Sequence, residues 1–172
     1  MDENPSDAQI RAGRSLTGES QKALAGRANV TESVLKLLES PSRKQPDSLN
    51  LKSVRLALEA QGVIFLSATD DVGEGVRYAK PGDKMRVTTD FFRHARALLD
   101  FSIDQMASIS GVGRTTIGGI ERRKFKKPPE DAVKKLRAVF YQHGVSFLPE
   151  ETDAGGGVRF SKPNYARYTV VV

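Results

Sequence analysis

The sequence predicts a mainly helical protein with a small amount of β-structure, built from two tandem copies of one unit. Three observations predict this fold class. The chain repeats itself at a fixed offset of 82 residues, apolar residues recur at helical spacing in both copies, and short strand-like runs follow the helices in each. Aligned without a gap, residues 9–81 share 22 identities in 73 positions with the residues 82 further on. An ungapped match of this length indicates a duplicated unit.

The duplication sets the predicted domain boundaries. We expect a disordered N-terminus at residues 1–8, a first unit at 9–82 and a second unit at 83–172. The link between the units, about residues 82–90, is short. A short link favours two packed units over two units on a flexible tether.

Each unit is predicted to contain four helices. Ser20 and Ser102 are the expected N-caps of the second helix, and Thr31 and Gly113 stand at the N-cap of the third. The final helix has apolar residues at helical spacing and ends before Gly62 or Gly144, where a left-handed residue is favoured. The first and final helices are expected at about 9–17 and 48–60 in the first unit, and at about 90–99 and 130–142 in the second.

A β-hairpin is predicted after the final helix of each unit. Gly-Val-x-Phe-Leu and Gly-x-Gly-Val-Arg occur in both copies, separated by a turn rich in glycine and acidic residues. Strand-like runs also occur at 85–88 and at 168–172. The second run could pair within the chain or across a homodimer.

The charge distribution favours an anionic partner. The formal net charge is +6. Residues 1–82 carry 11 basic and 11 acidic side chains, whereas residues 83–172 carry 16 basic and 10 acidic ones. The whole excess therefore lies in the second unit, which is expected to bind the anion.

Composition also bears on location and chemistry. The chain has no cysteine, which excludes disulfides, zinc fingers and thiol chemistry. Its acidic, polar start is unlike a secretory signal, and no apolar run approaches the ~18–20 residues that span a bilayer. We therefore expect a cytoplasmic protein.

No pattern of residues indicates an enzyme. His94 and His143 lack partners at metal-ligand spacing, and no nucleophile stands beside a base. The Gly155–Gly157 run precedes neither Lys-Ser/Thr nor a helix, so we predict a hairpin turn and not a phosphate loop. The expectation is a protein with no catalytic site, no metal and no cofactor.

The stretch from Ser102 to Glu121, SIDQMASISGVGRTTIGGIE, resembles the helix-turn-helix of Cro/C1-type regulators, also called xenobiotic-response-element-type regulators. The stretch from Ser20 to Glu39, SQKALAGRANVTESVLKLLE, is similar to the same motif. The resemblance covers residues 9–60 and 91–142. It implies a lambda-repressor-like helix-turn-helix fold in each unit and a pseudo-dimer within one chain. The hairpin is similar to an appendage on some bacterial members of this family.

The resemblance implies DNA-contacting residues around recognition helices near 113–122 and 31–39. Arg114 stands where a base contact is expected, and its guanidinium could bind guanine O6 and N7 in a bidentate manner. In the second unit the implied DNA-contacting residues are Ser102, Gly113, Arg114, Thr115, Thr116, Gly119, Arg122, Arg123, Lys124, Lys126 and Lys127. In the first unit they are Ser20, Gln21, Thr31, Glu32, Ser33, Lys36, Leu37, Arg43 and Lys44.

Two further features of the motif have structural interpretations. Arg14 with Glu39 and Arg96 with Glu121 match a structural ion pair of the family, so we expect them to stabilise the fold. The Gly118-Gly119 pair costs helix stability, near 1 kcal/mol each relative to alanine. It indicates either a close approach to DNA or a degenerate helix.

These observations favour a sequence-specific double-stranded DNA-binding transcription regulator, with repression as the expected mode and a nucleoid-associated, cytoplasmic location. The site would be an imperfect palindrome or an asymmetric pair of half-sites about 34 Å apart. The alternative is a protein-binding antiactivator or co-regulator, in which the first unit or both have lost DNA binding. Its motivation is the neutral first unit, with Glu32 at a base-contact position and Leu37 one turn later. A homodimer or a regulatory protein partner is compatible with both.

Overall fold

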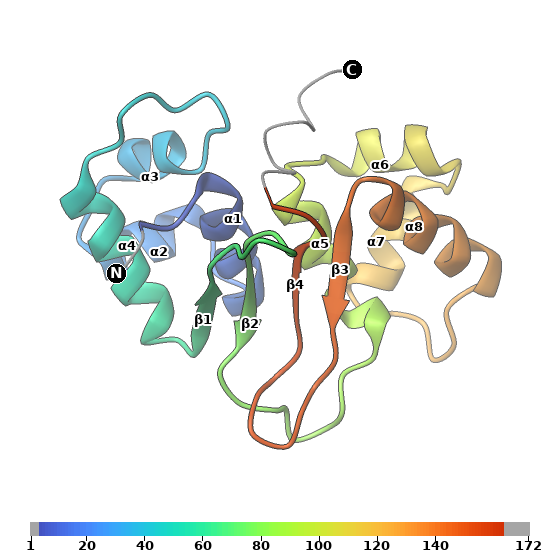
Figure 1. Ribbon diagram of the computed structural model, residues 1–172. Helices are drawn as coiled ribbons and strands as arrows, with labels where there is room; N and C mark the ends of the chain where they lie inside the picture. Colours follow the sequence, from blue (N-terminus) through green and yellow to red (C-terminus); the bar gives the residue numbers. More distant parts are fainter. Residues whose placement is uncertain (1–3, 164–172) are drawn as a thin grey trace.

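The computed structural model describes residues 4–163, and within them the chain forms two similar halves with eight α-helices and one four-stranded antiparallel sheet (Figure 1). The elements of the first half are α1 (Asp7–Thr17), α2 (Gln21–Ala28), α3 (Glu32–Leu38), α4 (Ser48–Glu59), β1 (Val63–Leu66) and β2 (Gly75–Tyr78). Those of the second are the 3-10 helix η1 (Thr88–Phe91), α5 (Phe92–Leu98), α6 (Ile103–Ser110), α7 (Arg114–Glu121), α8 (Glu130–Gln142), β3 (Val145–Leu148) and β4 (Gly157–Phe160). The predicted helices and hairpins are thus present in both halves.

The predicted helix ends are also confirmed. The hydroxyl oxygen of Ser20 accepts the backbone N–H of Ala23, and that of Ser102 accepts the N–H of Gln105, so each serine caps its helix. Gly62 and Gly144 have φ of 83° and 70°. This left-handed conformation is cheap for glycine alone, and it turns the chain from the final helix into the hairpin.

The two halves share one sheet, with strand order β1-β2-β4-β3. The central strands β2 and β4 pair antiparallel with Val76 opposite Val158. These valines are 82 residues apart, so each occupies the same place in its own half. Gly75 opposite Arg159 and Arg77 opposite Gly157 complete a register that is two-fold symmetric about the valine pair.

The repeated Gly-x-Gly motif permits this contact between the halves. The N–H of Gly73 donates to the carbonyl of Phe160 at 2.9 Å, and the N–H of Gly155 donates to the carbonyl of Tyr78 at 3.0 Å. A Cβ on either glycine would collide with the chain of the other half. The glycines predicted to form hairpin turns therefore also allow two backbones to approach.

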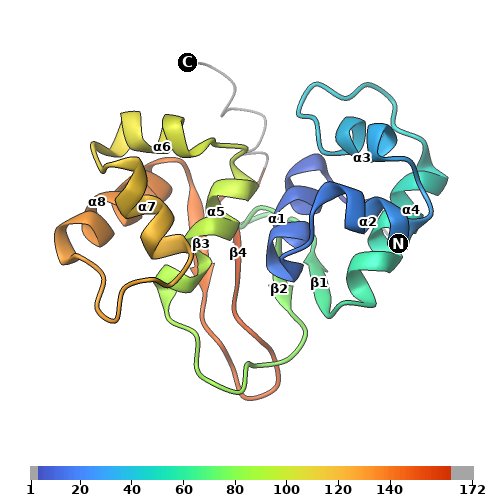
Figure 2. The ribbon, with the colours of Figure 1, turned by 180° about the vertical axis from the view of Figure 1, so that it is seen from behind.

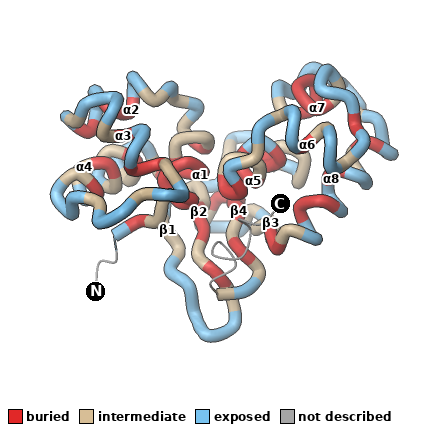
Figure 3. The backbone as a smooth tube through the Cα atoms, turned by 90° about the horizontal axis from the view of Figure 1, so that it is seen from above, coloured by how far each residue is buried: buried red, intermediate tan, exposed pale blue. Residues whose placement is uncertain are grey.

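Helices α1 and α5 contact each other and pack on β2 and β4 of the shared sheet (Figure 2). Buried residues of both helices and of the strands belong to one core. The colouring by burial in Figure 3 shows buried residues along α1, α5 and the strands. Packing of this kind agrees with the prediction from the short link. No helix among residues 4–163 is long and apolar enough to span a membrane.

The structure corrects two predictions. Residues 1–8 are not disordered as a whole, because Pro5 is buried, Ser6 caps α1 in a capping box with Gln9, and α1 begins at Asp7. Residues 85–88 form no strand, since Thr88 begins η1 and the run pairs with no other strand. The run at 168–172 lies outside the described residues.

Arg86 explains why the run at 85–88 is not a strand. Its guanidinium donates to Glu150 at 2.5 Å, and the same carboxylate accepts the N–H groups of Gly82 and Arg86. Although burial raises the pKa of Glu150, these three hydrogen bonds hold that pKa below its ordinary value. The link is therefore fixed to the second hairpin by side-chain contacts and not by strand pairing.

Candidate nucleic-acid interface

In each half, a short turn joins two helices and leaves the start of the second exposed. Helix α2 ends at Asn29 in the left-handed conformation (φ 53°), and α6 ends at Gly111 in the same conformation (φ 69°). The hydroxyl of Thr31 caps α3 by accepting the N–H of Val34, while Gly113 stands at the same position of α7 without a side-chain cap. Both N-cap positions were predicted.

The first turns of α3 and α7 carry exposed side chains that differ in charge. Glu32 and Ser33 are exposed in α3, and Arg114 and Thr115 take the same places in α7. Arg114 makes an ion pair with Asp104 of α6 at 2.7 Å, but its side chain remains 70% exposed. An exposed pair of this kind contributes at most about 1 kcal/mol, so Arg114 can exchange it for another acceptor.

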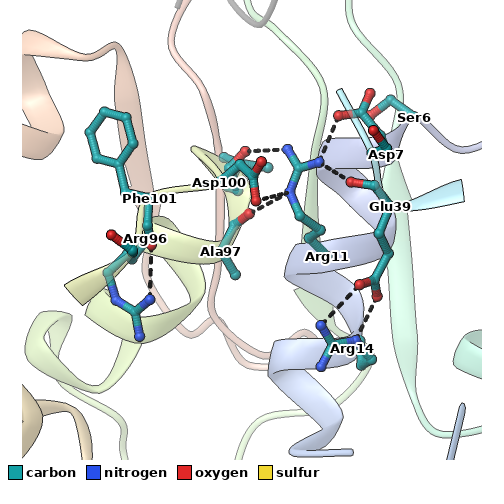
Figure 4. A network of polar contacts seen from close by, with 12 residues as sticks. Ser6, Asp7, Arg11, Arg14, Glu39, Arg96, Ala97, Asp100 and Phe101 are labelled. Carbon is teal, nitrogen blue, oxygen red and sulfur yellow. Dashed lines mark hydrogen bonds and ion pairs between the residues drawn. The ribbon is translucent and has the colours of Figure 1, made fainter. Parts of the chain in front are cut away.

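Buried ion pairs fix the far ends of α3 and α7 to α1 and α5, respectively, and Figure 4 shows the pair of the first half, Arg14 with Glu39. Arg14 donates to both carboxylate oxygens of Glu39, at 2.5 and 3.0 Å, and Arg96 donates to both of Glu121, at 2.7 and 2.8 Å. Both glutamates have side chains that are only 5% exposed. The predicted structural pairs are confirmed, and they hold both exposed helices in the same place in the two halves.

A basic loop follows α7. Arg122, Arg123, Lys124, Lys126 and Lys127 are all exposed. Arg123 has a left-handed backbone (φ 53°) and pairs with Asp90 at 2.9 Å, and Lys127 pairs with Glu130 at 3.2 Å. The loop carries more positive charge than these two carboxylates offset, which is the arrangement that attracts phosphates.

Two of the predicted contact residues, Gly119 and Thr116, are less accessible than the sequence suggests, and so is the neighbouring Gly118. Gly119 is buried beneath the ring of Phe125, so DNA cannot approach its α-carbon in this conformation. Gly118 lies in the same way beneath the guanidinium of Arg122. Thr116 is half-buried, whereas its neighbour Thr115 is exposed. The double glycine is thus explained by packing within the chain, a third interpretation that the sequence did not suggest.

The first half presents fewer free cations. Lys36 pairs with Glu32 at 3.0 Å, and the amide of Gln21 donates to Glu39 at 2.6 Å. Arg43 donates to the carbonyls of Leu38 and Pro5, at 2.9 and 2.8 Å, and burial lowers the pKa of its guanidinium. Three of the predicted DNA-contacting groups are therefore engaged within the chain.

The remaining predicted residues of the first half are on the surface. Ser20, Thr31, Ser33 and Lys44 are exposed, and Leu37 exposes 66% of its surface in the second turn of α3. Among the predicted contacts of this half, every cation except Lys44 has a carboxylate or carbonyl partner. The exposed face of α3 is nearly neutral, and that of α7 with its following loop is positive.

The comparisons with known proteins find no relative. No protein-family model matches the chain, and no match was found among curated proteins or among solved structures. Function has to be argued from the geometry alone.

An arginine that the sequence analysis did not single out links the halves. Arg11 lies in α1, and its guanidinium donates to the carbonyls of Ala97 and Leu98 in the other half, at 3.0 and 3.3 Å (Figure 4). It also pairs with Asp7 at 2.7 Å and lies 3.5 Å from Asp100, whose pKa burial raises. Its counterpart Arg93 is exposed. Because the two copies have the same residue at this position, the sequence does not indicate that Arg11 is buried and Arg93 is exposed.

His94 also makes a polar contact between the halves. Its Nδ1 lies 2.8 Å from the hydroxyl of Ser15, and its ring packs edge-on against Tyr78 and Phe91. Burial, with the positive charges of nearby arginines, lowers the pKa of His94 to about 3. The imidazole is therefore neutral near pH 7 and belongs to the interface between the halves. No group of three His, Asp or Glu side chains in residues 4–163 could hold a metal ion.

Proposed function

We propose that the protein is a sequence-specific double-stranded DNA-binding regulator of transcription, with repression as its mode. Its recognition helices would be α3 and α7, near 31–39 and 113–122, each in a lambda-repressor-like helix-turn-helix. The observation that carries the proposal is the exposed first turn of α7, with Arg114 and Thr115, together with the basic loop that follows the end of this helix.

The chemistry of this surface suits a major groove. The guanidinium of Arg114 can donate to O6 and N7 of one guanine, which is worth about 1–3 kcal/mol of discrimination. Lys124, Lys126 and Lys127 would neutralise phosphates beside the groove. Because each neutralised phosphate releases counterions, affinity would fall steeply with salt.

The shared sheet supports a pseudo-dimeric arrangement. The symmetric register about Val76 and Val158 relates the halves as the subunits of a two-fold dimer are related. Such an arrangement presents α3 and α7 on one side of the sheet. Because the two helices carry different side chains, the DNA site would consist of two unlike half-sites.

The test is selection of bound fragments from sheared genomic DNA at two salt concentrations. A common motif with unlike half-sites about one helical turn apart would support the proposal, whereas binding without a motif, lost at physiological salt, would contradict it. On the selected DNA, Arg114→Ala should relax preference at one base pair, and Lys126→Ala should weaken all sequences alike. Equal, sequence-independent losses would contradict a base contact by Arg114.

A second candidate function is favoured by the surface of α3. Its ion pair between Glu32 and Lys36 and its exposed Leu37 suit a protein partner better than a phosphate backbone. In this version the second half binds DNA and the first binds a regulatory protein.

A matched pair of substitutions distinguishes the two versions. Ser33 and Thr115 occupy equivalent exposed positions of α3 and α7. A new carboxylate there would repel phosphates. If Ser33→Asp and Thr115→Asp both weaken DNA binding, both helices contact DNA. If only Thr115→Asp does, the first half is available for a protein partner.

A further inference from the structure

Two glycines in α7 make room for side chains from the loop that follows the helix. Gly118 and Gly119 are buried. A Cβ added at Gly118 would lie 2.9 Å from Nη2 of Arg122, and one at Gly119 would lie 2.5 Å from Cε2 of Phe125. The helix is therefore covered at these two positions by a guanidinium and an aromatic ring, which rest on its backbone.

The backbone places these side chains. The N–H of Arg122 donates to the carbonyl of Gly118 at 3.1 Å, and the N–H of Lys124 donates to that of Gly119 at 2.9 Å. Between them, Arg123 adopts the left-handed conformation that reverses the chain at a helix end. The ion pair of Arg123 with Asp90 attaches this reversal to η1. Phe125 is thus held on α7 by hydrogen bonds, a turn and an ion pair.

The covered positions continue the two rows that begin in the exposed first turn. Residues four apart in a helix are neighbours on one face. Arg114, Gly118 and Arg122 form one row, so the guanidinium over Gly118 lies in line with that of Arg114. Thr115 and Gly119 form the next row, which the ring of Phe125 extends. Phe125 is 39% exposed and lies outside the buried core.

The first half lacks this arrangement. Lys36 and Leu37 stand where Gly118 and Gly119 stand, and Arg43 takes the place of Phe125. Arg43 donates instead to the carbonyls of Leu38 and Pro5. Small residues and the aromatic residue thus occur together in one copy and are replaced together in the other.

We infer that Phe125 is a base-contacting side chain of the second half, and that its ligand is the 5-methyl group of a thymine in the major groove. The inference rests on the proposed function. An apolar ring on the row of Thr115 faces the bases when α7 lies in the groove, while its neighbours Lys124 and Lys126 bind phosphates on the groove edge. The thymine methyl is the one apolar group that the major-groove edges of the bases present, and aromatic side chains recognise it by contact.

The experiment measures the affinity of the full chain for its selected DNA duplex with each thymine of the second half-site replaced, one at a time, by deoxyuridine. This replacement removes only the methyl group. Wild-type protein should lose about fourfold in affinity at one thymine, the value for one buried methyl group. Phe125→Ala should bind the unmodified duplex more weakly by a similar factor and should no longer respond to that replacement.

Two further variants separate contact from stability. Tyr141→Ala truncates an aromatic residue of α8 that is 77% exposed, and it should keep the wild-type response. Gly119→Ala keeps Phe125 but displaces its ring, and it should reduce the response to the methyl group while the protein stays folded by circular dichroism.

The outcomes are distinct. Suppose that the protein does select a DNA motif. If Phe125→Ala then responds to every replacement as wild type does, or if wild type responds to none, the inference is wrong and the proposed function stands. If no motif is selected in the first place, both are wrong.

Discussion

The two buried ion pairs should differ in their value to stability, although they occupy equivalent places. In Arg96→Met, the carboxylate of Glu121 is left without its bidentate partner at a position 5% exposed. An uncompensated buried charge of this kind costs about 3–5 kcal/mol. In Arg14→Met, the amide of Gln21 still donates to Glu39 at 2.6 Å. A hydrogen bond to a charged group contributes about 1.5–3 kcal/mol, so the loss in the first half should be smaller by that amount.

Urea unfolding followed by circular dichroism measures the difference. We expect a lower free energy of unfolding for Arg96→Met than for Arg14→Met. When Gln21→Leu is added to Arg14→Met, the loss of unfolding free energy should come close to that of Arg96→Met. Equal losses for the two single variants, or no added effect of Gln21→Leu, would refute the reasoning. The slope of the unfolding free energy against urea concentration should stay unchanged. An unchanged slope shows that every variant exposes the same amount of surface on unfolding.

Three further predictions concern glycines and the interface histidine. Gly155→Ala places a methyl group against the backbone of Lys80, so thermal melting should show a loss of about 1–3 kcal/mol, and a variant as stable as wild type would argue against the close contact of the hairpins. Gly26→Ala, in an open helical position of α2, should instead gain up to about 1 kcal/mol, and a loss there would mean that the site is not open. The depressed pKa of His94, about 3 against 6.5 when unfolded, means that the unfolded state binds the proton first. Stability is therefore full above pH 6.5 and falls by up to about 1.4 kcal/mol per pH unit as the pH drops toward 3. His94→Gln should flatten unfolding free energies measured across this range, and an unchanged slope would exclude His94 as the cause.

The elements were predictable from the sequence because their signals are local. Ser20 and Ser102 cap helices through their own hydroxyls, and Gly62 and Gly144 turn the chain through their own backbones. The copies also reinforced each other, since a capping residue or glycine that occurs twice at one offset is a stronger signal than a single one. The buried pairs of Glu39 and Glu121 came from the family resemblance and not from any local pattern.

The contacts between the halves were not predictable in the same way. Arg11 and Arg93 are identical in the two copies, yet one is buried between the halves and the other is exposed. The difference depends on carbonyls that the other half supplies, and a pattern within one copy carries no information about them. The strand predicted at 85–88 is wrong for the same reason. Arg86 is held by Glu150, and nothing in the run itself indicates that distant partner.

Phe125 was missed because it stands among lysines. A run of basic residues suggests a solvated loop, and the left-handed Arg123 that folds the ring onto Gly119 has no sequence signature. The adjacent glycines were the available signal. In α7 the two adjacent glycines leave room for the side chains of Arg122 and Phe125.

The symmetric pairing of β2 with β4 has a consequence for concentration. A regulator assembled from two separate chains comes apart on dilution, so the concentration of the paired form varies with the square of the chain concentration when chains are scarce. Here the two halves are covalently joined and meet within one molecule, where their effective concentration does not change with expression. The paired state is complete at a single copy per cell. The two surfaces can also diverge independently, since a substitution in one half is not imposed on the other.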